Sequence, residues 1–150
     1  MKHKKCIQWL YSLISSRFRH VVKTALKLLL VFVEYAEKNC LMLIDAIHTV
    51  DSEQERPPWF NIMKILQDFD ASDAELLIYA TTLINRCLNN VSDRSIYYDQ
   101  VDVLQDQGID ETIQLYMSKK ETDLDLLRQL QIFEAVLMFE DGDESGIALK

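Results

Sequence analysis

The sequence predicts an all-α protein, a solenoid of about eight helices. Apolar residues recur three and four positions apart along almost the whole chain, which is the spacing of one helix face. Only three glycines and two prolines occur in 150 residues, too few for the turns of a many-stranded β protein. A weak internal repetition of the helix patterns points toward stacked repeats.

The expected helices follow from the apolar periodicity and from residues that start and stop helices. In chain order they cover residues 6–14, 18–36, 41–50, 59–69, 73–90, a sixth that ends at Gly108, a seventh through Lys119, and 123–139. On the second helix the expected buried side consists of Val21, Val22, Ala25, Leu28, Leu29 and Phe32.

A polar loop is expected over residues 51–56, after the third helix. Pro57 and Pro58 then open the fourth helix, because the first turn does not need the N–H that proline lacks. Trp59 and Phe60 in that turn could form a binding hot spot. Packing against the preceding helix is the favoured interpretation of this aromatic pair.

Polar side chains next to the later helices are expected to cap them. Ser72 and Glu75 have the spacing of a capping box. Gly108 suits the left-handed conformation in which helices often stop. The other expected caps are Ser92 or Asp93 for the sixth helix, Asp110 for the seventh and Thr122 for the eighth.

Three helix stripes align with one another, at offsets of 55 and then 50 residues. The aligned positions are Val21, Val22, Ala25, Leu28 and Val33; Leu76, Leu77, Ala80, Leu83 and Leu88; and Leu126, Leu127, Leu130, Phe133 and Met138. The offsets exceed the ~42 residues of an armadillo repeat, a difference that loop insertions could supply. Because any two amphipathic helices align tolerably, this pattern alone leaves a compact bundle open.

Charge divides the chain into two unequal parts. The first 39 residues contain eight Lys and Arg against two acidic residues, a balance of +6, and the rest contains eight against twenty-two, a balance of −14. Most of this surface would repel nucleic acid and attract a basic peptide. The longest apolar run, residues 28–33, is far shorter than the ~20 residues of a membrane span, so no membrane span is expected.

No residue pattern indicates catalysis, a cofactor or a metal site. Cys6, Cys40 and Cys87 lie far apart among apolar residues and are expected to be reduced core thiols of a cytoplasmic protein. The sequence contains no glycine-rich phosphate loop and no pair of histidines on one helix face. A binding protein, rather than an enzyme, is therefore expected.

Several long segments, in one order, resemble the N-terminal regulatory region of the FHOD formins. They are VVKTALKLLLVFVEYAEKN (21–39), PPWFNIMKIL (57–66), DAELLIYATTLINRCL (73–88), YYDQVDVLQDQGI (97–109), TDLDLLRQLQIFE (122–134) and EDGDE (140–144). The resemblance covers nearly everything from Trp9 to Glu144.

This resemblance implies an armadillo-like solenoid, the formin-homology-3 or diaphanous-inhibitory region. Residues 1–17 would be an incomplete leading repeat, 18–139 the regulatory domain, and 140–150 an acidic to polar flexible tail. In such formins this region binds the basic, leucine-containing autoregulatory segment near the C-terminus and holds the actin-assembling domain inactive. Rho-family GTPases or kinases relieve that contact, and the location is cytoplasmic and cytoskeleton-associated.

Several parts of a whole formin have no counterpart in these 150 residues. No ubiquitin-like GTPase-binding domain, polyproline segment or actin-encircling domain is recognisable. GTPase binding through this chain is therefore not expected, and its relation to actin would be indirect.

The autoregulatory segment would bind where the second and fifth helices line the concave face of the solenoid. The candidate groove residues are Lys23, Lys27, Val31 and Glu34 on the second helix and Ile78, Thr82, Asn85, Arg86 and Asn89 on the fifth. Polar residues mixed with an exposed Val or Ile suit an amphipathic helix as ligand. A solvated helix face is the alternative for Lys23 and Lys27. A generic helical adaptor or membrane-surface scaffold, using the basic first forty residues, is the alternative function.

Overall fold

A computed structural model describes the backbone of residues 2–68 and 73–149, and the side chains of 5–68 and 73–139. These residues form eight α-helices and one short 3-10 helix, with no strand among them. The elements are α1 (Lys2–Ser12), η1 (Leu13–Ser15), α2 (Arg19–Tyr35), α3 (Glu37–Glu53), α4 (Phe60–Leu66), α5 (Ala74–Asn89), α6 (Arg94–Asp106), α7 (Ile109–Ser118) and α8 (Leu124–Leu149). The all-α prediction is confirmed.

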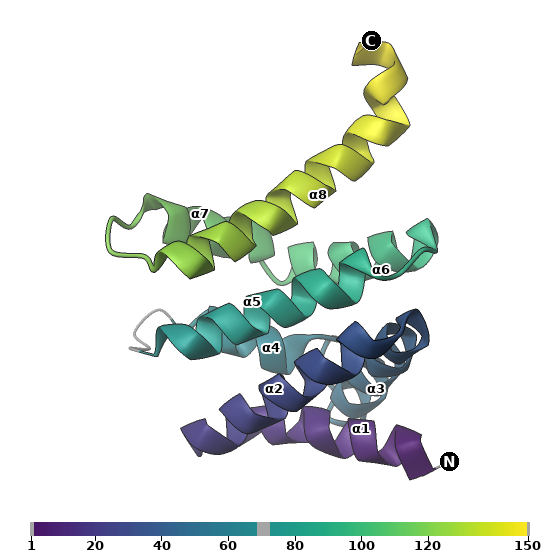
Figure 1. Cartoon of the computed structure of the whole chain (residues 1–150), viewed down its shortest axis with the longest axis vertical. Helices are drawn as coiled ribbons and strands as arrows, with labels where there is room; N and C mark the ends of the chain where they lie inside the picture. Colours follow the sequence, from purple (N-terminus) through teal and green to yellow (C-terminus); the bar gives the residue numbers. More distant parts are fainter. Residues whose placement is uncertain (1, 69–72, 150) are drawn as a thin grey trace.

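The helices stack in layers along the long axis of the molecule. Figure 1 shows α2, α5 and α8 one above another on the near side, with α1 beneath α2 and with α3, α4, α6 and α7 largely behind. Helix α2 packs on α5, and α5 packs on α8. These are the three helices whose apolar stripes align in the sequence, so the pattern of an armadillo-like solenoid is confirmed.

One continuous apolar core runs through the stack, from Ile7 in α1 to Phe133 in α8. Trp59 is completely buried in it, and its indole Nε1–H donates a hydrogen bond of 2.9 Å to Gln100 Oε1. The preferred interpretation of Trp59 as a core residue is therefore confirmed.

The predicted polar loop over residues 51–56 is partly helical. Helix α3 continues to Glu53, and Asp51 is fully buried rather than solvated. The Tyr11 hydroxyl donates a hydrogen bond of 2.5 Å to Asp51 Oδ2, which joins α1 to α3. The loop prediction was wrong because the partner of Asp51 lies 40 residues earlier in the chain.

The fourth helix starts later than the Pro-Pro pair predicts. Helix α4 begins at Phe60, and Trp59 precedes it with φ +71°, a left-handed conformation that is uncommon for a residue with a side chain. The prolines therefore lie in a turn before the helix and do not form its first turn.

The predicted helix caps are partly correct. Asp73 accepts a hydrogen bond from the backbone N–H of Glu75 and caps α5, whereas Ser72, the other half of the predicted box, lies outside the described residues. Asp93 caps α6 by accepting from Ser95. Ser92, the alternative cap, donates its hydroxyl to Glu37 instead.

The caps predicted for the last two helices were wrong. Gly108, with φ +90°, has the predicted left-handed conformation, and it also precedes the first residue of α7, where Asp110 was expected to be the cap. At α8, the Thr122 hydroxyl donates to the Tyr116 carbonyl. Asp123 accepts from the Asp125 backbone N–H and takes the capping role.

The chain is helical at both ends beyond the predicted limits. Helix α1 already begins at Lys2, and α8 continues from its predicted end at Phe139 to Leu149. Residues 140–149 therefore lie in this helix, and the flexibility expected for them stays a prediction. The boundary between a leading repeat and the main domain at residue 17 stays a prediction.

Candidate functional site

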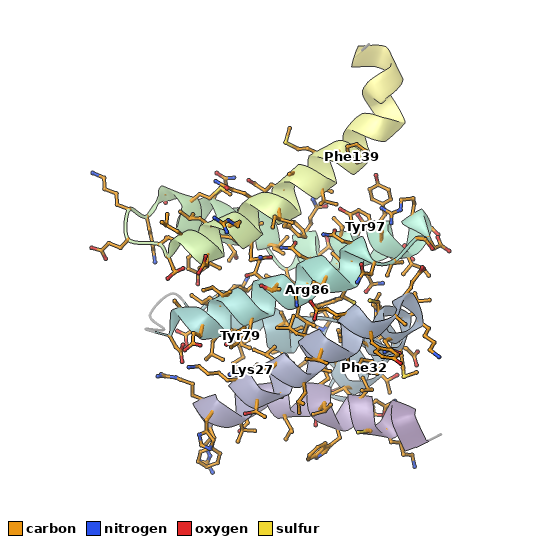
Figure 2. The ribbon with its side chains drawn as sticks, in the orientation of Figure 1. Lys27, Phe32, Tyr79, Arg86, Tyr97 and Phe139 are labelled. Carbon is orange, nitrogen blue, oxygen red and sulfur yellow. The ribbon has the colours of Figure 1, made fainter. Side chains whose placement is uncertain are left out.

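All predicted groove residues lie on α2 and α5, which are neighbours in the stack. Figure 2 shows Lys27 of α2 below Tyr79 and Arg86 of α5 on the near side of the molecule. The structure therefore brings the two predicted stripes together, but their side chains differ in exposure and in partners.

Charged contacts join the first turns of α2 and α5. Lys23 Nζ lies 2.7 Å from Asp73 Oδ2 and 3.3 Å from Glu75 Oε1. The hydrogen bond with Asp73 raises the pKa of Lys23. Burial favours a higher pKa for Asp73, but the hydrogen bond and charge of Lys23 lower that pKa overall. Lys23 thus links α2 to the start of α5 by ion pairs and is not simply a solvated residue.

Two further contacts continue along the same pair of helices. Lys27 Nζ lies 5.5 Å from the centre of the Tyr79 ring, within the range of a cation–π interaction. Arg86 Nη1 lies 2.6 Å from Glu34 Oε1. We call the contacts of Lys23, Lys27 and Glu34 with α5 the α2–α5 seam.

Beside the seam, apolar side chains of α2 face solvent. The exposed fraction is 66% for Val31, as predicted for this side chain, and 84% for Tyr35. Leu28 is 50% exposed, so its assignment to the buried side of the helix was wrong. On α5, Ile78 is half-buried and packs against the core. Leu28 and Tyr35 follow the three- and four-residue spacing of Val31, which could have indicated them.

Thr82 and Asn85 are not exposed, contrary to the groove prediction. Thr82 is 8% exposed, and its hydroxyl donates to the Ile78 carbonyl. Asn85 is 3% exposed, and its side-chain Nδ2 donates to the carbonyl of Gln129 in α8 at 2.8 Å. Asn85 thus joins α5 to α8, whereas the Thr82 hydroxyl bonds within α5. Arg86 and Asn89 keep exposed surface on α5.

The described residues form neither a cluster of metal-binding side chains nor a disulfide. No three or more of their His, Cys, Asp and Glu side chains are placed to hold a metal ion. All three cysteines are free thiols, but Cys6 is exposed, which corrects its assignment to the core. None of the described helices is both long and apolar enough to cross a bilayer.

The fold and this face define a class: an armadillo-like helical repeat domain whose stacked helices present an extended surface to other polypeptides. A family model described as the FHOD1/3 FH3 domain matches residues 1–112. The chain belongs to the FH3 domain family of these formins, as the resemblance in its sequence predicted.

Curated relatives agree with this family. FH1/FH2 domain-containing protein 3 of Mus musculus is 52% identical over 146 residues, which are 97% of this chain and 9% of the relative. FH1/FH2 domain-containing protein 1 of Homo sapiens is 47% identical over 141 residues, which are 94% of this chain and 12% of the relative. The chain thus spans about a tenth of the length of these relatives.

Proposed function

We propose that this chain is a non-catalytic regulatory module that binds the basic, leucine-containing autoregulatory segment of an FHOD formin. Binding would keep the actin-assembling part of the formin inactive, so the chain would act on the actin cytoskeleton indirectly and in the cytoplasm. Membership of the FH3 family, a regulatory N-terminal region, supports this proposal.

The main observation that supports the proposal is a row of exposed apolar side chains on α2, beside the α2–α5 seam. Leu28, Val31 and Tyr35 recur along one side of α2 and expose half or more of their surface. An amphipathic helix presents leucines at the same three- and four-residue spacing, so its anchors can pack against such a row. The Tyr and Val side chains would lose contact with water when the peptide binds.

The charge of the chain suits a basic ligand. Glu34 and Glu75, at the seam, remain 50% and 61% exposed at their side chains while they pair with Arg86 and Lys23. The residues after Asn39 carry a balance of −14, which would speed the approach of a cationic segment.

Replacing Val31 with Asp tests the proposed surface. We expect the dissociation constant for a peptide of the C-terminal autoregulatory segment of an FHOD formin to rise about tenfold or more, because a carboxylate would lie in the apolar contact. Fluorescence anisotropy with a labelled peptide measures this change. Ile78→Asp should weaken binding in the same direction.

Leu115→Asp is the matched control, since Leu115 is 48% exposed but lies on α7 rather than on α2 or α5. It should leave the affinity unchanged. Equal affinities for the wild-type chain, Val31→Asp and Ile78→Asp would show that the peptide does not bind here. Absence of any binding by the wild-type chain would contradict the proposed function itself.

A further inference from the structure

The two ends of the stack are formed by α1 and α8. Figure 1 shows α1 at one end of the long axis and α8 at the other, and the C-terminal part of α8 extends beyond the remaining helices. Helix α1 packs mainly against α2, α3 and η1, and α8 packs mainly against α5 and α7. Each of these two helices therefore packs on the stack through one side and leaves its outer side uncovered by the described chain.

The outer side of α1 combines an aromatic ring with positive charge. Ile7 and Tyr11 are buried, whereas Trp9, which points away from both at 3.6 residues per turn, is 59% exposed. Lys5, about one turn before Trp9, is exposed on the same side. The helix contains three Lys and no acidic residue. This end of the stack thus presents an apolar anchor next to cations.

The outer side of α8 is apolar, and the helix is acidic. Leu130 and Phe133 lie on its buried side, whereas Leu124, Met138 and Phe139 on the opposite side are 79%, 73% and 70% exposed. Figure 2 shows Phe139 on the part of α8 that extends beyond the other helices. The helix contains six acidic residues against one basic residue. The two ends of the stack therefore carry exposed apolar groups and opposite charge.

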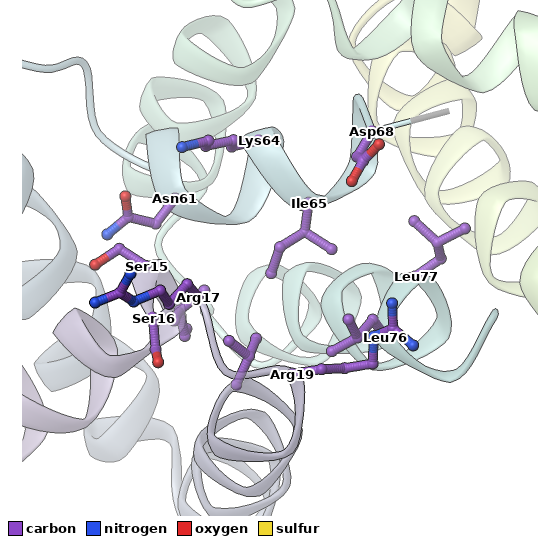
Figure 3. A pocket seen from close by; sticks show the side chains of 12 residues that line it. Ser15, Ser16, Arg17, Arg19, Asn61, Lys64, Ile65, Asp68, Leu76 and Leu77 are labelled. Carbon is purple, nitrogen blue, oxygen red and sulfur yellow. The ribbon is translucent and has the colours of Figure 1, made fainter. Parts of the chain in front are cut away.

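Other cations near the start of the chain face carboxylates of the same molecule. Arg17 and Arg19 line a pocket of about 550 Å³ together with Asp68 (Figure 3), and Arg19 Nε lies 3.7 Å from Asp73 Oδ2. By contrast, Lys5 forms no ion pair with a carboxylate among the described side chains. The positive charge that remains available at this end therefore belongs to α1.

We infer that copies of this chain associate head to tail, with the outer side of α8 in one copy packed against the outer side of α1 in the next. The basic helix then meets the acidic one, and the Trp9 ring is buried against Met138 and Phe139. Stacked helical repeats contact only their neighbours, so this contact continues the stack into a second molecule.

The projecting part of α8 gains most from this contact, because a helix without packing partners is only marginally stable in water. The contact joins two different surfaces, so each copy keeps one free end and the assembly can grow. The exposed row on α2 takes no part in it, so self-association and peptide binding are independent of each other.

Sedimentation velocity of the full chain at low salt tests the inference. We expect the weight-average mass to rise above 17.5 kDa with concentration and to fall again when salt screens the two ends. Trp9→Asp, and separately Met138→Asp/Phe139→Asp, should each raise the dissociation constant of self-association about tenfold or more, because an aromatic anchor is replaced with a carboxylate. All three side chains are exposed, so the fold should survive.

A mixture of these two variants tests the direction of the contact. Trp9→Asp keeps an intact α8 surface, and Met138→Asp/Phe139→Asp keeps an intact α1 surface. The mixture should therefore form a one-to-one dimer and nothing larger, although each variant alone stays monomeric at the same concentration. A monomeric mixture would overturn the inference, because the two intact surfaces would then not bind each other.

Lys5→Glu removes no apolar group and should still weaken self-association, because it places a carboxylate opposite the acidic α8. Leu115→Asp on α7 and Val31→Asp on α2 are the matched controls, since both residues are exposed but lie away from the two ends. Both should associate as the wild type does. A wild-type chain that is monomeric at every concentration, or an equal loss of association in either control, would overturn the inference.

Discussion

Tyr11 and Asp51 form a hydrogen bond inside the first layers of the stack. Burial raises the pKa of the Asp51 carboxyl, although the Tyr11 hydroxyl partly opposes this increase. Because the pKa is higher in the folded chain than in the unfolded one, ionised Asp51 destabilises the fold. This cost diminishes as the pH falls through the folded pKa.

Tyr11→Phe should therefore lower the free energy of unfolding by about 1–3 kcal/mol at pH 8, because ionised Asp51 loses its donor. The loss should be smaller at pH 5.5, where more of Asp51 is protonated. Urea unfolding at both pH values measures it. Tyr35→Phe, at an 84% exposed tyrosine, is the control and should change little. A penalty that grows toward acid pH would contradict the assigned shift.

Asn85 connects α5 to α8 through the carbonyl of Gln129 and through the Gln129 side chain at 3.0 Å. Few other polar contacts join these two helices among the described residues. The amide therefore adds directional bonding to a largely apolar helix contact.

Asn85→Ala should lower the free energy of unfolding by about 1–2 kcal/mol, because its hydrogen bonds and packing are lost. Asn89→Ala, four positions further on the same helix but exposed, should have a much smaller effect. Chemical denaturation of the two variants makes the comparison. Equal effects would mean that Asn85 does not stabilise the α5–α8 contact.

The sequence predicted where the helices lie better than it predicted which of their polar side chains are exposed. The stripes of α2, α5 and α8 were found because each repeats over several turns. Thr82 and Asn85 were misplaced because a polar residue beside an apolar stripe normally faces water, and the chain that covers Asn85 lies 44 positions away. The predicted end of the third helix was wrong for a similar reason, because Asp51 is buried against Tyr11, which lies 40 positions earlier in the chain.

The continuous core leads us to expect that the whole stack unfolds as one unit. Each layer contacts its neighbours, and no layer of the described chain has a separate core. A short solenoid of this kind should unfold cooperatively, although longer repeat arrays lose cooperativity.

The two tryptophans allow a test, because Trp9 is 59% exposed and Trp59 is fully buried. In Trp9→Phe, fluorescence reports only on Trp59, near the middle of the stack. We expect its urea transition to coincide with the loss of helix measured by far-UV circular dichroism. Loss of helix at lower urea than the fluorescence change would show that outer layers unfold separately.

The seam also fixes how far along its axis α5 can lie relative to α2. Lys23, Lys27 and Glu34 meet Glu75, Tyr79 and Arg86, and each partner is 52 positions further in the sequence. A slip of four residues, about one turn, would place Lys27 opposite Leu83 and Glu34 opposite Asn90. In this slipped arrangement both ion pairs of the seam, Lys23 with Glu75 and Glu34 with Arg86, would be lost. The ion pairs of the seam therefore favour the observed alignment of α2 and α5 over this slipped one.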